Sequence, residues 1–415
     1  MSAGRGEAGP RGDDVRSDAH IAVELRDSGG VEIALTSKVG ALYGDRIREQ
    51  VEAGCRALGV DHARVEVEDV GALPFVLDAR LEAAVRAAGH DGPELLPERH
   101  PASLAAGSTA RDRLRRSRLY LPGGTPKYMI NAALHAPDAV ILDLEDSVAP
   151  SEKAAARLLV RNALRFLDWA DCERMVRINQ LPAGLDDLPF VVGHGAQLIL
   201  IPKTESADQV VAVAEAAATL AASVPGASSD AGVAPPWIMP ILESAAGIQR
   251  AEAIAAAHPT VVALTIGLED YTADIGAART PAGTESFWAR SMVVAAARAA
   301  GVQPIDSVHS DVSDPAGLEA AVREARSLGF EGKGCIHPRQ IPVVHRGFDA
   351  DDAELAYAQR VVRAFAEAQA QGVGVVSLGS KMIDPPVVKR AQRTVDLAVR
   401  SGRIAADWAA DGEES

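Results

Sequence analysis

Residues 139–145, AVILDLE, form a nearly continuous apolar run that ends in acidic side chains. Seven further short runs of this kind lie between positions 118 and 337, and Ala-rich helical patterns such as 205–223 and 246–257 separate most of them. Continuous apolar runs are typical of parallel strands that are buried on both faces. Eight such strands alternating with helices predict an α/β fold, a closed (β/α)₈ (TIM) barrel rather than an open sheet. The other runs are 118–122 (RLYLP), 175–179 (MVRIN), 198–203 (LILIPK), 237–243 (WIMPILE), 261–267 (VVALTIG), 303–308 (QPIDSV) and 333–337 (KGCIH).

The composition of the chain argues against several classes of protein. Of its 415 residues, 47% are hydrophobic and 24% are charged, as in ordinary globular proteins. No apolar run reaches the roughly 18 residues of a membrane span, and residues 1–18 contain no apolar signal segment. The net charge of −15 argues against nucleic-acid binding. Because the three cysteines, Cys55, Cys172 and Cys335, match neither a metal site nor a disulfide framework, we expect a soluble cytoplasmic protein without nucleic-acid or membrane partners.

The patterns before and after the barrel predict a small second domain and a helical extension. Period-two alternation over 21–25 and 31–35, on either side of a Gly-containing turn, predicts a β-hairpin. Gly, Pro and Ser punctuate the stretch between the two domains, which predicts a flexible linker. The expected organisation is a disordered tail at 1–18, a small α+β domain at 19–88, the linker at 89–116, the barrel at 117–345 and a C-terminal helical extension at 346–415.

Barrel enzymes place their functional groups at the carboxyl ends of the strands. Glu243 and Asp270 follow two adjacent predicted strands, and paired carboxylates completed by waters and substrate oxygens are typical of a Mg²⁺ site. Histidines and cysteines do not cluster, which disfavours zinc. A single acidic residue at a strand end is more often a helix cap or an ion-pair partner, so this pattern alone leaves that interpretation open. The other polar residues near these strand ends include Asp143, Glu145, Asp146, Arg177, Asn179, Lys203, Glu269, Asp306 and His337.

Two parts of the chain resemble known families. The barrel segment and the extension, residues 117–403, carry an ordered series of motifs that resembles the citrate lyase β-chain (HpcH/HpaI aldolase/citrate lyase) family over nearly its full length. These motifs are LYLPGGTPK, AVILDLEDSVAPSEK, VRIN, IPKTES, ILESAAG, GLEDYTADIG, GFEGKGCIHPRQI and SKMIDPP. Residues 20–88 resemble the citrate lyase acyl carrier protein (γ chain) through RDSGGVEIAL, YGDRIREQV and ALPFVLDARLEAAVRAA.

The first resemblance implies roles for residues of the barrel. Glu243 and Asp270 match the Mg²⁺ ligands of the family, the same pair that the strand ends indicate. Arg177, in VRIN, matches an arginine that grips a substrate carboxylate. Asp146 and Lys203 are expected to contact the metal-binding and substrate-binding side chains rather than the metal or the substrate itself.

Both resemblances imply roles for residues outside the barrel. Asp384, in MIDPP, matches an aspartate that reaches the site of a neighbouring subunit in related lyases, and a homo-oligomer, a trimer or a multiple of one, is expected. Ser28, which in a Gly-rich turn is more often a simple turn residue, matches the carrier serine that bears phosphoribosyl-dephospho-CoA. The loop Gly123-Gly124-Thr125 departs from the family, in which a longer polar or basic residue is frequent.

The implied activity is retro-aldol (Claisen-type) cleavage of a 3-hydroxyacyl thioester with Mg²⁺ as cofactor. The expected reaction converts citryl-[acyl-carrier protein] to acetyl-[acyl-carrier protein] and oxaloacetate, and a citrate lyase α chain, an acyl transferase, is an expected partner. One alternative is a lyase or thioesterase for CoA thioesters such as malyl-CoA or citramalyl-CoA, with a vestigial carrier domain. Another is a non-catalytic carrier or assembly subunit, against which the intact set of Glu243, Asp270 and Arg177 argues.

Overall fold

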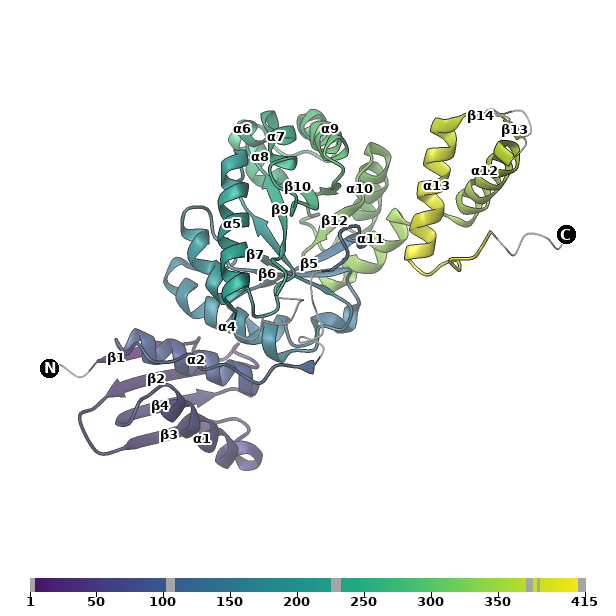
Figure 1. Cartoon of the computed structure of the whole chain (residues 1–415). Coiled ribbons are helices and arrows are strands. Elements are labelled where there is room, and N and C mark those ends of the chain that lie inside the picture. The colour runs from purple at the N-terminus through teal and green to yellow at the C-terminus, as the bar shows by residue number, and fades with distance from the viewer. Residues whose placement is uncertain (1–3, 102–108, 225–232, 371–375, 379–380, 410–415) are drawn as a thin grey trace.

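The computed structural model describes residues 4–101, 109–224, 233–370, 376–378 and 381–409 (Figure 1). Within these ranges the chain forms a small sheet domain, a large barrel and a pair of helices that projects from the barrel (Figure 1). None of the helices in the described ranges is both long and apolar enough to span a bilayer.

The small domain is a four-stranded sheet with two helices. Its strands are β1 (Arg5–Ala8), β2 (Ala19–Leu25), β3 (Val31–Ser37) and β4 (Ala63–Asp69), in the order β1-β2-β4-β3, and its helices are α1 (Gly40–Ala57) and α2 (Pro74–Ala87). The predicted hairpin is wrong, because β4 lies between β2 and β3, antiparallel to the first and parallel to the second. Period-two alternation predicts that a segment forms a strand, but not which other strands lie beside it in the sheet. One of the two inner positions of the sheet belongs to β4, whose alternate residues are buried, and one of its two edges belongs to the more exposed β3.

The expected disordered tail is also wrong for its described part. Residues 5–8 form β1, which pairs with β2 in antiparallel register from Arg5 opposite Glu24 to Ala8 opposite Ile21. A Cβ at Gly6 would lie 2.3 Å from the carbonyl oxygen of Ala84, so only glycine lets this strand approach the end of α2 so closely. The glycines that suggested disorder therefore permit close packing. Residues 1–3 lie outside the described ranges.

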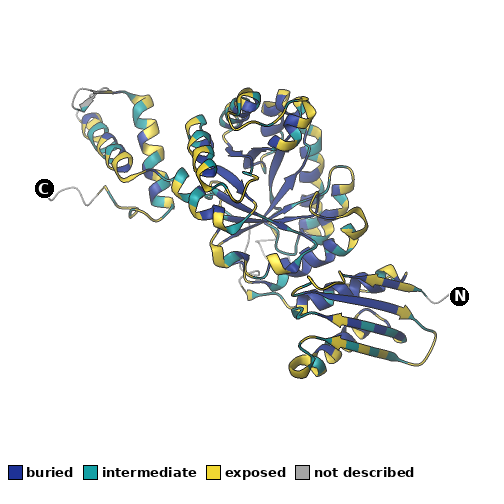
Figure 2. Cartoon of the chain, turned by 180° about the vertical axis from the view of Figure 1, so that it is seen from behind, coloured by how far each residue is buried: buried dark blue, intermediate teal, exposed yellow. Residues whose placement is uncertain are grey.

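The predicted barrel is confirmed. Eight parallel strands close in the order β10-β11-β12-β5-β6-β7-β8-β9, and Figure 2 shows these strands as mostly buried. Apolar side chains such as Ile141, Met175, Leu200 and Met239 pack in one buried cluster inside the barrel. The strands are β5 (Ser117–Pro122), β6 (Ala139–Asp143), β7 (Glu173–Arg177), β8 (Leu198–Ile201), β9 (Trp237–Leu242), β10 (Ala263–Ile266), β11 (Gln303–Asp306) and β12 (Gly332–Cys335). The α-helices around them are α4 (Lys153–Phe166), α5 (Ala207–Ser223), α6 (Ala245–Gln249), α7 (Ala251–Ala255), α8 (Leu268–Asp274), α9 (Thr284–Ala299), α10 (Pro315–Leu328) and α11 (Ile341–Phe348).

The expected flexible linker packs against the barrel in its described N-terminal part. The Arg165 side chain of α4 donates to the carbonyl of Pro97, and the backbone N–H of His100 donates to the carbonyl of Arg165 (2.8 Å). Leu95 is partly buried against the main hydrophobic core. Backbone groups of this stretch hydrogen-bond to α4, which a composition rich in Gly and Pro does not reveal. Residues 102–108 lie outside the described ranges.

The small domain docks on the barrel through α2 and α4 (Figure 1). The rings of Phe75 and Phe166 stack with centroids 5.5 Å apart. Nη2 of Arg161 on α4 lies 2.5 Å from Oε2 of Glu82 on α2, and both side chains are completely buried. Because a buried charge is stable only when it is paired and hydrogen-bonded, this ion pair ties the two domains together.

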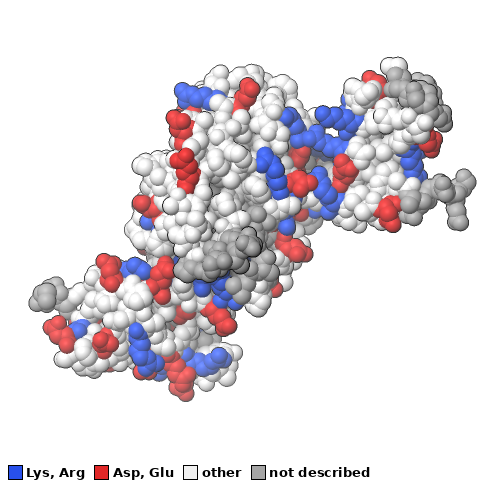
Figure 3. Space-filling model, in the orientation of Figure 1, with Lys and Arg blue, Asp and Glu red and all other residues white. Residues whose placement is uncertain are grey.

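The C-terminal extension has a separate core. Helices α12 (Asp352–Ala370) and α13 (Pro385–Arg400), joined through the short strands β13 (Val376–Leu378) and β14 (Lys381–Ile383), enclose a hydrophobic cluster that is distinct from the barrel core. Figure 3 shows basic and acidic side chains gathered where this extension meets the barrel. There Glu331 pairs with both Arg298 and Arg393.

We expect loss of the interdomain ion pair to destabilise the chain. Arg161→Met leaves the buried Glu82 with only the partly exposed Arg86 as an ionic partner, so the free energy of unfolding should fall by about 3 kcal/mol. The matched control is Arg323→Met, which removes an exposed pair with Glu319 and should cost about 1 kcal/mol or less. Urea unfolding measures both changes. Equal losses in the two variants would contradict the proposed contribution of the pair.

Candidate active site

A cavity of about 470 Å³ opens at the carboxyl ends of the barrel strands. Side chains from seven strands or from the loops that follow them line it, and most of the charged ones lie at its rim. The charged lining residues are Arg118, Asp143, Asp146, Arg177, Glu243, Glu269 and Asp270. The cavity therefore contains three of the residues that the sequence singled out as catalytic, Arg177, Glu243 and Asp270.

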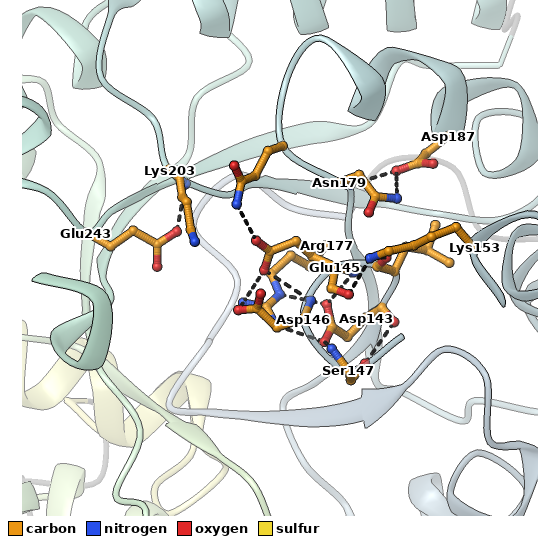
Figure 4. A network of polar contacts seen from close by, with 12 residues as sticks. Asp143, Glu145, Asp146, Ser147, Lys153, Arg177, Asn179, Asp187, Lys203 and Glu243 are labelled. Atoms are coloured by element: carbon orange, nitrogen blue, oxygen red, sulfur yellow. Dashed lines mark hydrogen bonds and ion pairs between the residues drawn. The ribbon is translucent and has the colours of Figure 1, made fainter. Parts of the chain in front are cut away.

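Glu243 and Asp270 meet around Lys203. The backbone N–H of Lys203 donates to Oε1 of Glu243 (2.7 Å), and Nζ of the same residue lies 3.2 Å from Oδ1 of Asp270. Lys203 has a left-handed backbone (φ 47°), which costs a non-glycine residue of order 1 kcal/mol. Figure 4 shows Lys203 directed toward Glu243. Lys203 thus contacts both carboxylates, one through its backbone N–H and the other through its ammonium group.

A glycine makes room for the carboxylate of Glu243. A Cβ at position 267 would lie 2.4 Å from Oε2 of Glu243 and 2.9 Å from its Cβ. Gly267 directly follows β10, so the side chain from β9 can lie across the end of the neighbouring strand. This close approach brings Glu243 toward the first turn of α8, which carries Asp270.

The environment of Glu243 disfavours its ionised form. Burial, assisted by the negative charges of Asp270 and Glu145, raises its pKa to about 7, although the hydrogen bond from Lys203 lowers it. Carboxylates that crowd together in a partly buried site repel one another. A cation between Glu243 and Asp270 would relieve this repulsion.

Arg177 lies on the opposite side of the cavity, in a network of acidic side chains (Figure 4). Nε and Nη2 of Arg177 donate to the two carboxylate oxygens of Asp143 (2.7 and 2.8 Å). Nη1 lies 3.0 Å from Glu145 and 3.7 Å from Asp146. Burial raises the pKa of Asp143, but the hydrogen bonds and charge of Arg177 outweigh burial and hold that pKa below its usual value.

This network limits how Arg177 can hold a substrate. The side-on edge of the guanidinium, Nε with Nη2, is occupied by Asp143. A substrate carboxylate would have to meet the end-on edge, Nη1 with Nη2, close to Glu145. The predicted bidentate grip is therefore restricted to one edge of the fork.

Comparison with known proteins identifies the barrel. The HpcH/HpaI aldolase/citrate lyase family model matches residues 116–338. The citrate lyase subunit beta of Escherichia coli (strain K12) is 37% identical over 294 residues, which are 70% of this chain and 96% of that protein. The chain belongs to the HpcH/HpaI aldolase/citrate lyase family. It is a lyase.

Other relatives extend the similarity. The L-malyl-CoA/beta-methylmalyl-CoA lyase of Cereibacter sphaeroides is 34% identical over 305 residues, 68% of this lyase and 94% of that one. The crystal structure of protein CitE from Mycobacterium tuberculosis, in complex with magnesium, acetoacetate and coenzyme A, has a TM-score of 0.57 and 32% identity, covering 71% of this chain and 100% of that one. A separate family model, the malonate decarboxylase delta subunit of the acyl carrier protein (ACP) family, matches residues 12–88. The lyase therefore carries an N-terminal domain that resembles acyl carriers.

The structure does not bring every predicted residue of the lyase to the cavity. Asp384 lies at the start of α13, where its side chain accepts a hydrogen bond from the N–H of Val387 (3.1 Å) and caps the helix. Ser28 lies in an exposed turn of the small domain, and Figure 1 shows the connection between β2 and β3 at an outer end of the sheet, away from the barrel. Neither residue lines the cavity of its own chain.

Sequence reasoning missed the functions of Asp143 and Glu145 in the lyase. Both lie at the end of the predicted run 139–145, yet nothing in the sequence indicates that they face Arg177, which lies at the end of the following strand. The register of β6 with β7 does so, because it pairs Asp143 with Arg177. The acids in DLED and the arginine in VRIN stand at the ends of consecutive predicted strands, and this is the signal that could have suggested an ion pair.

We expect Arg177→Met to destabilise the lyase in a pH-dependent way. Without the guanidinium, burial should raise the pKa of Asp143 above its value in the unfolded chain, so that the folded state binds more protons and its stability falls as pH rises. The loss relative to wild type, about 3–5 kcal/mol at most, should be larger at pH 8 than at pH 5. Urea midpoints at both pH values measure it. A pH-independent loss, like that expected for the exposed-pair control Arg56→Met, would contradict this account.

Proposed function

We propose that this lyase cleaves a carbon–carbon bond of a 3-hydroxyacyl thioester with the help of Mg²⁺, and that its substrate is citryl-[acyl-carrier protein], which yields acetyl-[acyl-carrier protein] and oxaloacetate. The observation that carries the proposal is that Glu243, Asp270 and Arg177 line one cavity, in which Figure 4 shows Glu243 apart from the network around Arg177. The similarity to citrate lyase beta subunits and the carrier-like N-terminal domain support the choice of substrate.

The residues of the cavity fit a magnesium ion. Oε1 of Glu243 already accepts one hydrogen bond, from the backbone of Lys203. Asp270 is about half-exposed, and its carboxylate forms an ion pair with the ammonium group of Lys203. No group of three or more His, Cys, Asp or Glu side chains in the described ranges is arranged to hold a metal. Two carboxylates suffice for Mg²⁺, which keeps several waters and takes oxygen atoms from its substrate. Structural relatives with bound magnesium support this assignment.

The chain's own side chains then supply binding and orientation. Magnesium, when bound, polarises the hydroxyl and the neighbouring carboxylate of the acid. Arg177, positioned by Asp143, offers its end-on edge to that carboxylate. As the carbon–carbon bond breaks, the hydroxyl gives its proton to a water molecule and becomes a keto group, while the electron pair passes to the carbon next to the thioester carbonyl. That carbon takes up a proton, for which we propose Asp384 of a second copy, because the motif MIDPP resembles that of lyases in which this aspartate reaches the site of a neighbouring subunit.

The small domain supports a carrier function. Ser28 is exposed between Arg26 and Gly30, and the positions of Gly29 and Gly30, both with positive φ, face open space. A modifying enzyme could therefore reach the hydroxyl and attach the phosphoribosyl-dephospho-CoA group. Under this proposal the lyase forms a homo-oligomer, a trimer or a multiple of one, and exchanges acyl groups with a citrate lyase α chain.

One observation favours a second candidate function, cleavage of free CoA thioesters. The small domain is docked through α2 and α4, with Ser28 at an outer turn, so delivery of an arm to the cavity of the same chain is not favoured by this arrangement. Malyl-CoA lyases are among the relatives. In this alternative the carrier domain is vestigial.

Removal of either carboxylate should abolish magnesium binding and turnover. We expect Glu243→Gln and Asp270→Asn to weaken Mg²⁺ affinity at least tenfold, or about 1.4 kcal/mol, and to reduce cleavage of the thioester in parallel. Isothermal titration with Mg²⁺ and a turnover assay measure these changes. The matched control is Glu252→Gln, an exposed glutamate on α7. Near-normal affinity in either site variant would show that the assigned ligands are wrong.

The modification of Ser28 distinguishes the two candidate functions. In a host that has the modifying enzymes, the intact mass of the wild type should include the prosthetic group, and that of Ser28→Ala should not. Ser28→Ala should lose turnover of carrier-bound substrate but keep any cleavage of free CoA thioesters, whereas the exposed control Ser313→Ala should behave as wild type. If the wild type stays unmodified and cleaves CoA thioesters efficiently, the carrier proposal fails and the CoA-dependent lyase replaces it.

A further inference from the structure

Arg118 lies at the floor of the cavity, inside the barrel. It is the second residue of β5, its side chain is directed into the barrel, and only 1% of its surface is exposed. It nevertheless contributes to the lining of the cavity together with Ile241 and Thr265. A fully charged side chain thus lies beneath the rim at which Glu243 and Arg177 face each other.

The guanidinium of Arg118 makes only weak or neutral contacts. Nη1 donates to Sδ of Met239 (3.1 Å), and Nη2 donates to Oγ1 of Thr265 (3.1 Å) and to the backbone carbonyl of Asp306 (3.3 Å). Nε is buried and has no hydrogen-bond acceptor among the described residues. No carboxylate in the described ranges forms an ion pair with this arginine.

Most other buried arginines in the described ranges have a carboxylate partner, although Arg174 has none. Arg115, three residues before Arg118 in the sequence, donates two hydrogen bonds to Glu173 (2.7 and 2.8 Å), and both side chains are completely buried. Arg161 pairs with the buried Glu82. This is the usual arrangement, because an unpaired buried charge costs several kcal/mol. Arg118 departs from it.

The nearest acidic side chain does not compensate for this charge. Asp306 lies at the end of β11, but its carboxylate accepts hydrogen bonds from Nζ of Lys333 (2.7 Å) and from Nε and Nη2 of Arg290 (both 3.2 Å). Two cations therefore already share this carboxylate. Burial lowers the pKa of Arg118, as expected for a cation that lacks a close counter-ion.

Tyr120 adds a second polar group between Arg118 and the rim. It lies two residues further along β5, also faces the cavity, and its ring is 5.4 Å from the guanidinium carbon of Arg177. Burial raises the pKa of Tyr120, so its phenol stays neutral and remains a hydrogen-bond donor. The side of β5 that faces the cavity thus presents two hydrogen-bond donors, the guanidinium of Arg118 at the floor and the phenol of Tyr120 nearer the rim.

The separation of floor and rim suits a short carbon chain. Thr265, which contacts Arg118, lies two residues before Gly267, against which the carboxylate of Glu243 packs. Two residues of a parallel strand rise about 6.6 Å. An acid that is held at the rim through one carboxylate could therefore place a second carboxylate, one or two carbons away, near the guanidinium.

We propose that Arg118 binds a second carboxylate of the acid substrate and thereby selects substrates whose oxo-acid product is a dicarboxylate over those whose product is a monocarboxylate. This inference rests on the proposed function, because it assumes that the acid binds at the rim beside Glu243 and Asp270. It assigns a specificity-determining function to a residue of the barrel interior.

The inference is tested on the full-length lyase with Mg²⁺, using two stable 2-hydroxy acids as probes. Malate carries a second carboxylate and lactate does not, and isothermal titration measures the affinity of each. We expect the wild type to bind malate at least tenfold more tightly than lactate. Arg118→Met should reduce malate affinity at least tenfold, about 1.4 kcal/mol, and leave lactate affinity unchanged. Arg118→Lys, which keeps the charge, should retain part of the preference.

Thermal unfolding without any acid separates binding from a structural function. If Arg118 is an unpaired buried charge, Arg118→Met should not lower the unfolding midpoint, because an apolar side chain of similar volume removes the cost of that charge. A lower midpoint with an unchanged malate-to-lactate ratio would overturn the inference.

The wild-type measurement alone also tests the inference, whether or not the variants fold. If the wild type binds both acids equally well, the specificity inference fails while the proposed rim site stands. If the wild type with Mg²⁺ binds neither acid, the proposed function fails, and this inference fails with it.

Discussion

Closure of eight parallel strands into a barrel places all their carboxyl ends on one rim, and the site depends on this constraint. Arg177, Glu243 and Asp270 are far apart in the sequence, yet the register of β7, β9 and β10 brings them around one cavity. The same register pairs Asp143 with Arg177. Without closure, the strand ends at the two edges of an open sheet would lie apart, and no single cavity would collect them.

The sequence predicts those features that depend on local pattern, but it does not predict features that depend on contacts between distant segments of the chain. Apolar runs predict all eight barrel strands, because strands buried on both faces must be apolar nearly throughout. Alternation likewise predicts β2 and β3, but it contains no information on the insertion of β4 between them. Gly6 and Leu95 belong to stretches whose composition indicates disorder, yet each packs against a helix of a neighbouring part of the chain. Such contacts depend on tertiary structure alone.

The same limit applies to the site. The strand-end rule indicates Glu243, Asp270 and Arg177, because it requires only the order of strands and loops. It cannot show that Asp143 occupies one edge of the Arg177 fork, or that the backbone of Lys203 turns its N–H toward Glu243. Nor can it show that Arg118, the first residue of the predicted run 118–122, lies buried without a carboxylate partner. Pairing of charges depends on side-chain reach across the barrel, which local sequence does not determine.

The distribution of charge in the cavity accounts for both ligands that the lyase is proposed to bind. Five acidic and two basic residues line it, and the acids lie mainly at the rim, where Glu243 and Asp270 repel each other until a cation lies between them. At the floor the charge has the opposite sign, because Arg118 has no carboxylate partner among the described residues. A metal at the rim and an anionic group at the floor would each offset the charge of the side chains that surround it. A dicarboxylic acid bound to Mg²⁺ satisfies both ends at once, whereas a monocarboxylic acid satisfies only the rim.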